Sequence, residues 1–159
     1  MTDLRRLTNL IPTILGLALL VVAAVVIAGC GDDAETAGNG NSPDAAFASE
    51  MIVHHRGAIE MAESAKRQAE RDEIKQLASE IIDAQRTEIA SMQRIGRELK
   101  AHGVDNKPLG MSDSQMGMDF DMPMLDDAGD FDKAFIDMMI PHHRGAIAMA
   151  KLQLDEGSH

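Results

Sequence analysis

The sequence predicts an all-α fold in which long helices pack nearly antiparallel in a bundle. Apolar residues recur at alternating spacings of four and three in three long segments, as in helices that share a core. No segment alternates convincingly between apolar and polar residues with a period of two, so no sheet is expected. The third observation is an internal repeat: residues 46–62 return 88 residues later as residues 134–150, with 12 of 17 positions identical.

Residues 1–29 are expected to be the signal peptide of a lipoprotein. Arg5 and Arg6 precede an apolar run over residues 10–28, and the run ends in the sequence IAGC at Cys30. This ending resembles a bacterial lipobox, which implies a lipid-modified cysteine as the first mature residue and an anchor on the extracytoplasmic face of the cell membrane. The alternative is an uncleaved transmembrane anchor, because about 18 apolar residues are just enough to span a bilayer.

Composition limits the classes of partner. Cys30 is the only cysteine, which excludes disulfides within one chain and thiolate metal sites. The net charge of −11 becomes −12 once residues 1–29, with two basic and one acidic residue, are removed, so nucleic acid is not an expected partner. Residues 30–43 are rich in Gly, Asp and Asn and are expected to be a flexible tether. Residues 44–159 suit a single domain.

Three long helices are expected within this domain. The first runs from about residue 44, opened by Pro43 or Asp44, to about residue 70. The second covers residues 72–100 and stops at Gly103, and the third covers residues 130–156. Pro141 falls inside the third helix at the place of Val53 in the first, and it is expected to kink or restart that helix because it removes a hydrogen bond.

The repeat concentrates soft-metal ligands. It keeps the pairs His54-His55 and His142-His143, and Met51 and Met139 precede them by three and four residues, so that one helix can offer a thioether and an imidazole to one ion. Thioether sulfur selects Cu(I), and imidazole also suits Cu(II). The seam positions predict that His54 and His142 face inward and that His55 and His143 lie at the flank. The alternative is that these histidines are hydrogen-bonded core residues without a metal.

Other repeated residues have less direct roles. Met61 and Met149 share the face of His54 and His142, but they lie two helical turns away, about 10 Å, and cannot bind the same ion without bending. Arg56 and Arg144 are expected to be solvated or ion-paired. Gly57 and Gly145 each cost about 1 kcal/mol within a helix, and this repeated cost suggests close helix approach.

Gln85 and Glu88 interrupt the apolar seam of the second helix. A buried carboxylate needs a partner, so Glu88 is expected to find a cation, a histidine or solvent. In the functional interpretation, Gln85 or Glu88 accepts a proton from an imidazole that binds metal. In the alternative, Glu88 forms a structural salt bridge to Arg56 or Arg144.

A methionine-rich loop is expected over residues 103–129. Five methionines are interleaved there with aspartates: Met111, Met116, Met118, Met122 and Met124. Methionines spaced two apart on an extended chain can converge on Cu(I), as in the methionine-rich tracts of extracytoplasmic copper proteins, which this loop resembles. The alternative is that they are adaptable fillers packed on the bundle.

The doubled motif MIxHHxxAIxMA, with a helix carrying Gln85, Glu88, Ile89 and Met92 as QxxEIxxM, resembles the bacterial "domain of unknown function 305" family. The resemblance covers residues 44–159 and implies a ferritin-like four-helix bundle. In the family, each HH helix has a partner helix, and here His159 corresponds to Arg71. The resemblance therefore implies three long helices with the fourth missing. Either the chain is a truncated gene product, or self-association or another chain completes the bundle.

Some members of that family are periplasmic copper-binding proteins linked to copper resistance. The resemblance and the repeated ligands together suggest an envelope-anchored lipoprotein that binds or buffers copper, and no enzymatic activity is expected. One alternative is a structural or interaction module without metal. Another is a ferritin-like di-metal oxidoreductase, but such sites need several inward carboxylates and the repeat does not keep its carboxylates.

Overall fold

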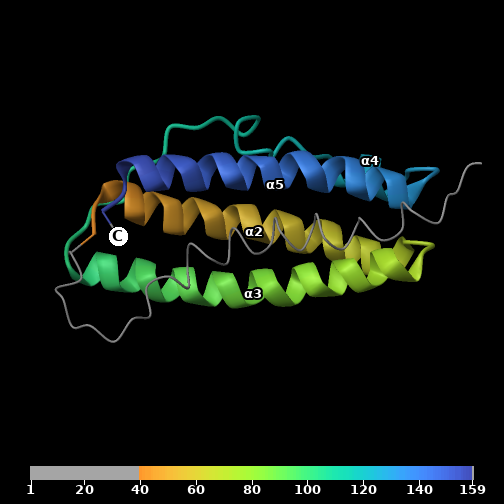
Figure 1. Ribbon diagram of the computed structural model, residues 1–159, viewed down its shortest axis with the longest axis horizontal. Helices are drawn as coiled ribbons and strands as arrows, with labels where there is room; N and C mark the ends of the chain where they lie inside the picture. The colour runs from red at the N-terminus through yellow and green to blue at the C-terminus, as the bar shows by residue number, and fades with distance from the viewer. Residues whose placement is uncertain (1–39, 159) are drawn as a thin grey trace, which may run out of the picture. The chain divides into compact units, whose positions relative to one another are not determined.

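The computed structural model describes residues 40–158, and every regular element in this range is a helix (Figure 1). Three helices are long: α2 (Ser42–Gln68), α3 (Asp72–Ala101) and α5 (Phe131–Glu156). A short helix, α4 (Met122–Asp126), precedes α5. The predicted all-α helical bundle is confirmed. The proposed signal peptide, Cys30 and most of the tether lie outside the described residues.

The observed helix ends refine the predicted ones. α2 begins at Ser42, because the Asn41 side chain accepts from the backbone N–H of Asp44 while the Asp44 carboxylate accepts from that of Asn41. The helix therefore begins two residues before the expected start at residue 44. The expected restart at Pro141 is wrong, because α5 continues unbroken through it, with a single ladder hydrogen bond removed.

α2 runs antiparallel to both α3 and α5 and packs against each of them (Figure 1). The start of α2 is joined to the end of α5 through Asp44, which accepts hydrogen bonds from the side chain of Gln153 and from Ser158. Burial raises the pKa of the Asp44 carboxyl, but the hydrogen bonds from Asn41, Gln153 and Ser158 outweigh this effect and lower it. These bonds fix how α5 lies along α2.

The opposite end of the α2–α5 pair is held by a second set of polar contacts. Asp132 accepts hydrogen bonds from the backbone N–H groups of Glu70 and Arg71, at 2.9 and 3.0 Å. Asp126 of α4 accepts from Ser64 of α2. With both ends joined, the two copies of the repeat lie antiparallel, and their central histidines are brought to the same level. None of the helices in residues 40–158 has the length and apolar character needed to cross a membrane.

Methionine dominates one part of the core. Four buried methionines, one each from α2, α3, the loop after α3, and α5, pack into one apolar cluster with two alanines: Met51, Met92, Met116, Met149, Ala48 and Ala146. Unbranched thioether side chains adapt to irregular space, and here they fill the junction of three helices and a loop.

Candidate functional site

The two histidine pairs of the repeat meet where α2 packs on α5. The rings of His54 and His142 lie with their centroids 3.7 Å apart and their planes inclined by 38°. His55 lies 6.2 Å from His54, and His143 lies 6.0 Å from His142, measured between ring centroids. His54, His55 and His142 are buried, and His143 is partly exposed. The structure thus places His54 and His142 inward, as the seam predicted.

The hydrogen bonds of His54 determine which ring nitrogen carries its proton. Its Nε2 lies 3.0 Å from the carbonyl oxygen of Met116 and 3.0 Å from that of His142. Carbonyl oxygens only accept hydrogen bonds, so Nε2 must carry the proton and donate it to both. The lone pair is therefore on Nδ1, which is buried and has no hydrogen-bond partner among residues 40–158.

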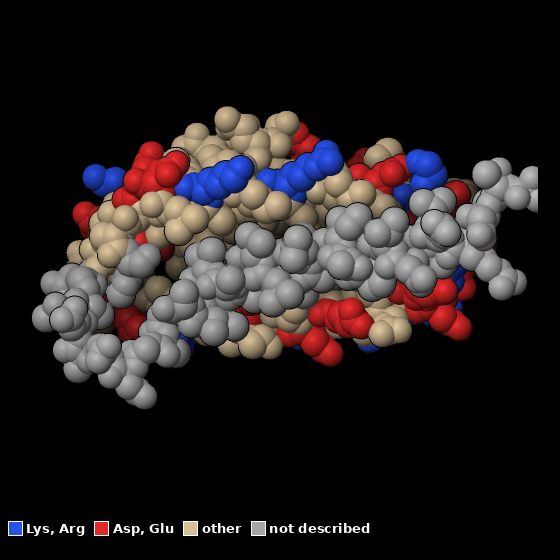
Figure 2. Space-filling model, in the orientation of Figure 1, with Lys and Arg blue, Asp and Glu red and all other residues tan. Residues whose placement is uncertain are grey.

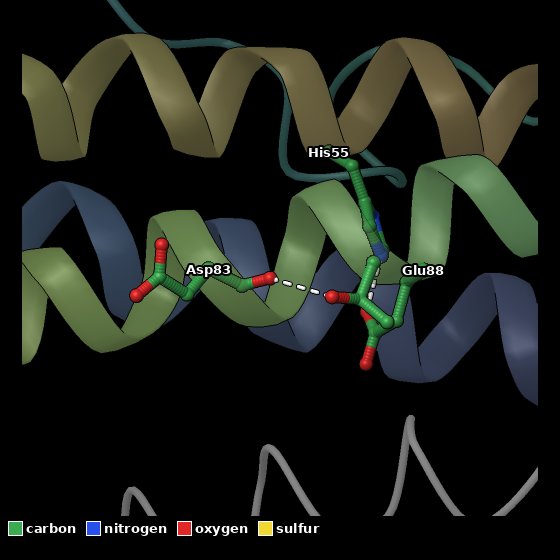
Figure 3. A network of polar contacts seen from close by, with 4 residues as sticks. His55, Asp83 and Glu88 are labelled. Atoms are coloured by element: carbon green, nitrogen blue, oxygen red, sulfur yellow. Dashed lines mark hydrogen bonds and ion pairs between the residues drawn. The ribbon is translucent and has the colours of Figure 1, made fainter.

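His55 is held by a carboxylate from the neighbouring helix. Its Nε2 donates to Oε2 of Glu88 on α3 over 2.6 Å, and Figure 3 shows the imidazole reaching from α2 to this group. Nδ1 of His55 is again buried without a partner in the described part of the chain. This is the contact expected of an outer-shell carboxylate, and no ion pair between Glu88 and Arg56 or Arg144 occurs within residues 40–158.

Gln85 lies at the centre of the α3 seam. Its side chain is buried, and its Oε1 has no partner among the described residues. The Glu88 side chain lies at the edge, 12 % exposed. Of the two polar interruptions, only Glu88 forms a hydrogen bond to a histidine of the cluster within residues 40–158, so the imidazole is supported by Glu88 rather than by Gln85.

His142 and His143 differ from their copies on α2. His142 is fully buried, and neither of its ring nitrogens has a hydrogen-bond partner within residues 40–158. His143 donates from Nδ1 to the carbonyl oxygen of Met139 on its own helix, over 3.0 Å, which leaves the lone pair on Nε2. All four imidazoles therefore have a nitrogen lone pair that is not used by the hydrogen bonds of the fold.

Burial favours the neutral form of three of these rings. Burial, with a smaller contribution from the nearby His55, lowers the pKa of His54 to about 4. Burial lowers the pKa of His142 to about 2, with His54 as the next cause. Burial also lowers the pKa of His143. A neutral imidazole is the form that binds a metal ion, so these rings need no deprotonation at neutral pH.

The segment after α3 covers the cluster. Phe120 meets the ring of His142 edge-on at 5.7 Å between centroids. A Cβ on Gly57 would lie 2.8 Å from Cζ of Phe120, and a Cβ on Gly145 would overlap the carbonyl group of Met116. The expectation that these glycines allow two helices to approach holds in part at Gly57, where a Cβ would also lie 3.3 Å from Nε2 of His142 on α5, but at Gly145 the loop is what approaches. No periodicity marks a loop residue, so the sequence pattern did not reveal Phe120 or the Met116 carbonyl.

The repeated and loop methionines are only partly brought together. Met51, Met116 and Met149 share the core cluster, and Met111 and Met118 pack against it. Met61 and Met139 are buried elsewhere along the helices. The expected extended Met122-x-Met124 pair is wrong: both residues belong to α4, where side chains two apart point in different directions, and Met124 is 63 % exposed.

The donors present fit a metal ion of low coordination number. Residues 40–158 contain no group of three or more His, Cys, Asp or Glu side chains placed to hold one ion. The cluster instead offers pairs of neutral imidazole nitrogens, with the buried thioethers of Met51 and Met139 one helical turn before His54 and His142. Soft thioether sulfur selects Cu(I), whereas imidazole nitrogen suits copper, zinc and other transition metals.

The family model described as "Domain of unknown function (DUF305)" matches residues 44–159, which is most of the chain. The chain therefore belongs to this family. No curated protein matches the chain. No solved structure matches it either.

Proposed function

We propose that this member of the DUF305 family binds copper as Cu(I) between α2 and α5, with His54 and His142 as its central ligands. The observation that carries this proposal is the set of buried imidazole nitrogens without partners: Nδ1 of His54 and both ring nitrogens of His142. Burying a polar atom without a hydrogen bond costs about 1–3 kcal/mol. Three such atoms on two neighbouring rings therefore lower the stability of the metal-free fold.

A ligand role explains most of this cost, because a bound ion would take up the lone pair of His54 and the single lone pair of neutral His142, and only the N–H of His142 would stay without a partner. The fold already prepares the rings for it. Two carbonyls orient His54, and Glu88 orients His55. Carbonyl and carboxylate oxygens usually orient metal-bound imidazoles in the same way. Met51 and Met139 are the thioethers best placed along the helices to join them. A Cu(I) ion held there would be shielded from solvent and oxidants by the segment that carries Met116 and Phe120.

The cellular role that fits is copper buffering at the extracytoplasmic face of the bacterial cell membrane. It rests on the IAGC sequence ending at Cys30, where a lipid would anchor the protein. Changing Cys30→Ser is expected to release the protein from the membrane fraction or to block its maturation. Unchanged processing and attachment would instead favour a transmembrane anchor.

A helical module without metal is the second candidate. It is favoured by the lack of any three-ligand group of His, Cys, Asp or Glu in the described residues and by the tight packing of Met111, Met116 and Met118. In that case the four histidines are packing residues. The two candidates make opposite predictions for His142, whose ring contributes no hydrogen bond to the described fold.

The deciding experiment is a competition titration of the purified full chain with Cu(I) and a chromophoric Cu(I) chelator. Wild type is expected to take up Cu(I), and Ag(I) in its place, but not Zn(II). His142→Leu is expected to weaken Cu(I) binding by at least about tenfold. His102→Leu is the matched control, because His102 is exposed and lies outside the cluster. Equal Cu(I) affinity in wild type and His142→Leu would overturn the proposed site.

A further inference from the structure

The internal repeat shows which face of α5 lacks a partner. On α2, the stripe Ala48, Ile52, His55 and Ile59 lies on the side of α3, where His55 bonds to Glu88. The repeat places Ile136, Ile140, His143 and Ile147 at the same positions of α5, and we call these four residues the α5 stripe. Three of the four are more exposed than their counterparts on α2, and Ile140 is 41 % exposed.

No described helix covers the α5 stripe in the way that α3 covers its counterpart. Within residues 40–158, α5 packs against α2 and, near its start, against the short α4. The loop residues Met116 and Gly117 press against the backbone of α5 at Gly145 and Pro141. An apolar stripe with 4-3-4 spacing is the pattern of a helix that pairs with another helix.

The charges beside the α5 stripe indicate which helix that is. Four exposed residues follow one another at intervals of seven along one flank: Asp130, Asp137, Arg144 and Lys151. Two acids come first and two bases follow. Arg144 forms no ion pair with any residue of the described part of the chain, and Asp137 bonds only to Lys133 of its own helix. Figure 2 shows Lys and Arg side chains in a row over the helix labelled α5 in Figure 1.

This order of charges on one α5 helix is complementary to the same order on a second, antiparallel α5 helix. If two copies of α5 lie parallel, acids meet acids and bases meet bases. If they lie antiparallel, each acid meets a base, and residues that flank an apolar seam set partner choice and orientation in this way. A two-fold axis perpendicular to the helices gives such a contact, with the same surface used on both copies.

We propose that two copies of this chain pair through the α5 stripe, with their α5 helices antiparallel. In this register Ile136 lies opposite the partner's Ile147, and Ile140 lies opposite the partner's His143. On the flank, Asp137 lies beside the partner's Arg144, and Asp130 lies beside the partner's Lys151. The pairing needs no metal, so it goes beyond the proposed copper site and stands or falls separately from it.

The test is the mass of the full chain in mild detergent, measured by sedimentation over a range of concentrations. Wild type is expected to be a dimer. Arg144→Asp gives the flank a run of three acids and is expected to raise the dimer dissociation constant by at least about tenfold. Asp137→Arg is expected to act in the same direction. The double variant Asp137→Arg with Arg144→Asp restores opposite charges across an antiparallel pair, and the dimer is expected to recover.

The repeat supplies matched controls. Arg56→Asp changes the same residue type at the same exposed motif position, but on α2, and it is expected to leave the dimer intact. Val53→Glu is the control for Ile140→Glu, because Val53 is 50 % exposed on α2, and only Ile140→Glu is expected to give monomers. A wild-type monomer, an unaffected Arg144→Asp dimer, or a double variant that stays dissociated would each overturn the proposed pairing.

Discussion

The two copies of the repeated motif have nearly the same residues but different surroundings. On α2, His54 donates to two carbonyls and His55 to a carboxylate. On α5, the ring nitrogens of His142 have no hydrogen-bond partner within residues 40–158, and the ring of His143 bonds only to a carbonyl of its own helix. The difference arises because the partner elements are not repeated: α3 stands beside α2, and the loop after α3 covers the pair from one side.

The same residue therefore has different contacts in the two copies of the motif. The α2 copy is the anchored half of the cluster, since its imidazoles have fixed protons and fixed directions. The α5 copy contributes the His142 ring, whose nitrogens have no well-formed hydrogen bond within residues 40–158, although the nearby backbone of His54 acts to raise its pKa. Changing the same residue in the two copies is therefore the most direct way to separate packing from ligand binding.

The largest difference is expected for the glycines. A Cβ on Gly145 would overlap the backbone of Met116, and backbone cannot turn aside as a side chain can. Gly145→Ala is therefore expected to lower the free energy of unfolding by about 3 kcal/mol. Gly57→Ala meets the tip of the Phe120 side chain and, at 3.3 Å, Nε2 of His142, and both are side chains that can shift. It also gains helix propensity, so its free energy of unfolding is expected to stay within about 1 kcal/mol of wild type. Urea unfolding measures both, and equal effects would contradict the close approach of loop and helix at Gly145.

The second largest effect is expected on how the free energy of unfolding depends on pH. The pKa of His54 is lowered in the fold from its usual 6.5 to about 4, so the unfolded chain takes up a proton at a pH where the folded chain does not. The stabilisation is fully present above pH 6.5 and is lost as the pH falls towards 4. His55 of the same helix, His142 and His143 of α5 and the Met116 carbonyl face this ring, and they do not offer a negative charge to it.

The expected loss is on the order of 2 kcal/mol between pH 7 and pH 4.5 in the metal-free protein. His54→Leu is expected to reduce this loss without removing it, because burial lowers the pKa of His142 as well, whereas replacing the exposed His102 leaves the profile unchanged. A stability that is constant between pH 7 and 4.5 would show that His54 is not buried as a neutral ring.

A smaller effect is expected at the carboxylate that distinguishes His55 from His143. Glu88→Ala leaves the Nε2–H of a buried imidazole without an acceptor, at a cost of about 1–2 kcal/mol. Glu88→Gln keeps an acceptor oxygen and is expected to cost less. In nitrogen NMR spectra the ring signals of His55 are expected to change and those of His143 to stay, because Met139 holds the latter. Equal changes in both rings would remove the asymmetry between the copies.

Much of the fold could be predicted because long helices repeat their pattern many times. The seams of α2, α3 and α5 gave their bounds within a few residues, and the duplicated motif predicted that His54 and His142 face inward. The contact between His55 and Glu88 was one of two outcomes foreseen for that carboxylate. Which side chains of a bundle helix are buried depends on the spacing of its apolar residues, and this spacing can be read from a single sequence.

The cover of the cluster could not be predicted in the same way. α4, the edge-on contact of Phe120 and the carbonyl of Met116 all belong to a stretch without periodicity, where backbone direction depends on tertiary contacts. Asn41 was missed as the helix cap because Pro43 and Asp44 are also common at helix starts. The different surroundings of the two motif copies follow from these same irregular elements.

The central claim is that His142 is present for a ligand rather than for the fold, and one set of unfolding curves tests it. Wild type and His142→Leu are unfolded by urea with and without Cu(I) under reducing, oxygen-free conditions. Without metal, His142→Leu is expected to be at least as stable as wild type, because it removes two buried nitrogens without partners. With Cu(I), wild type is expected to become the more stable of the two, since only it gains binding energy in the folded state. A metal-free His142→Leu that is clearly less stable, with Cu(I) stabilising both proteins equally, would contradict the account.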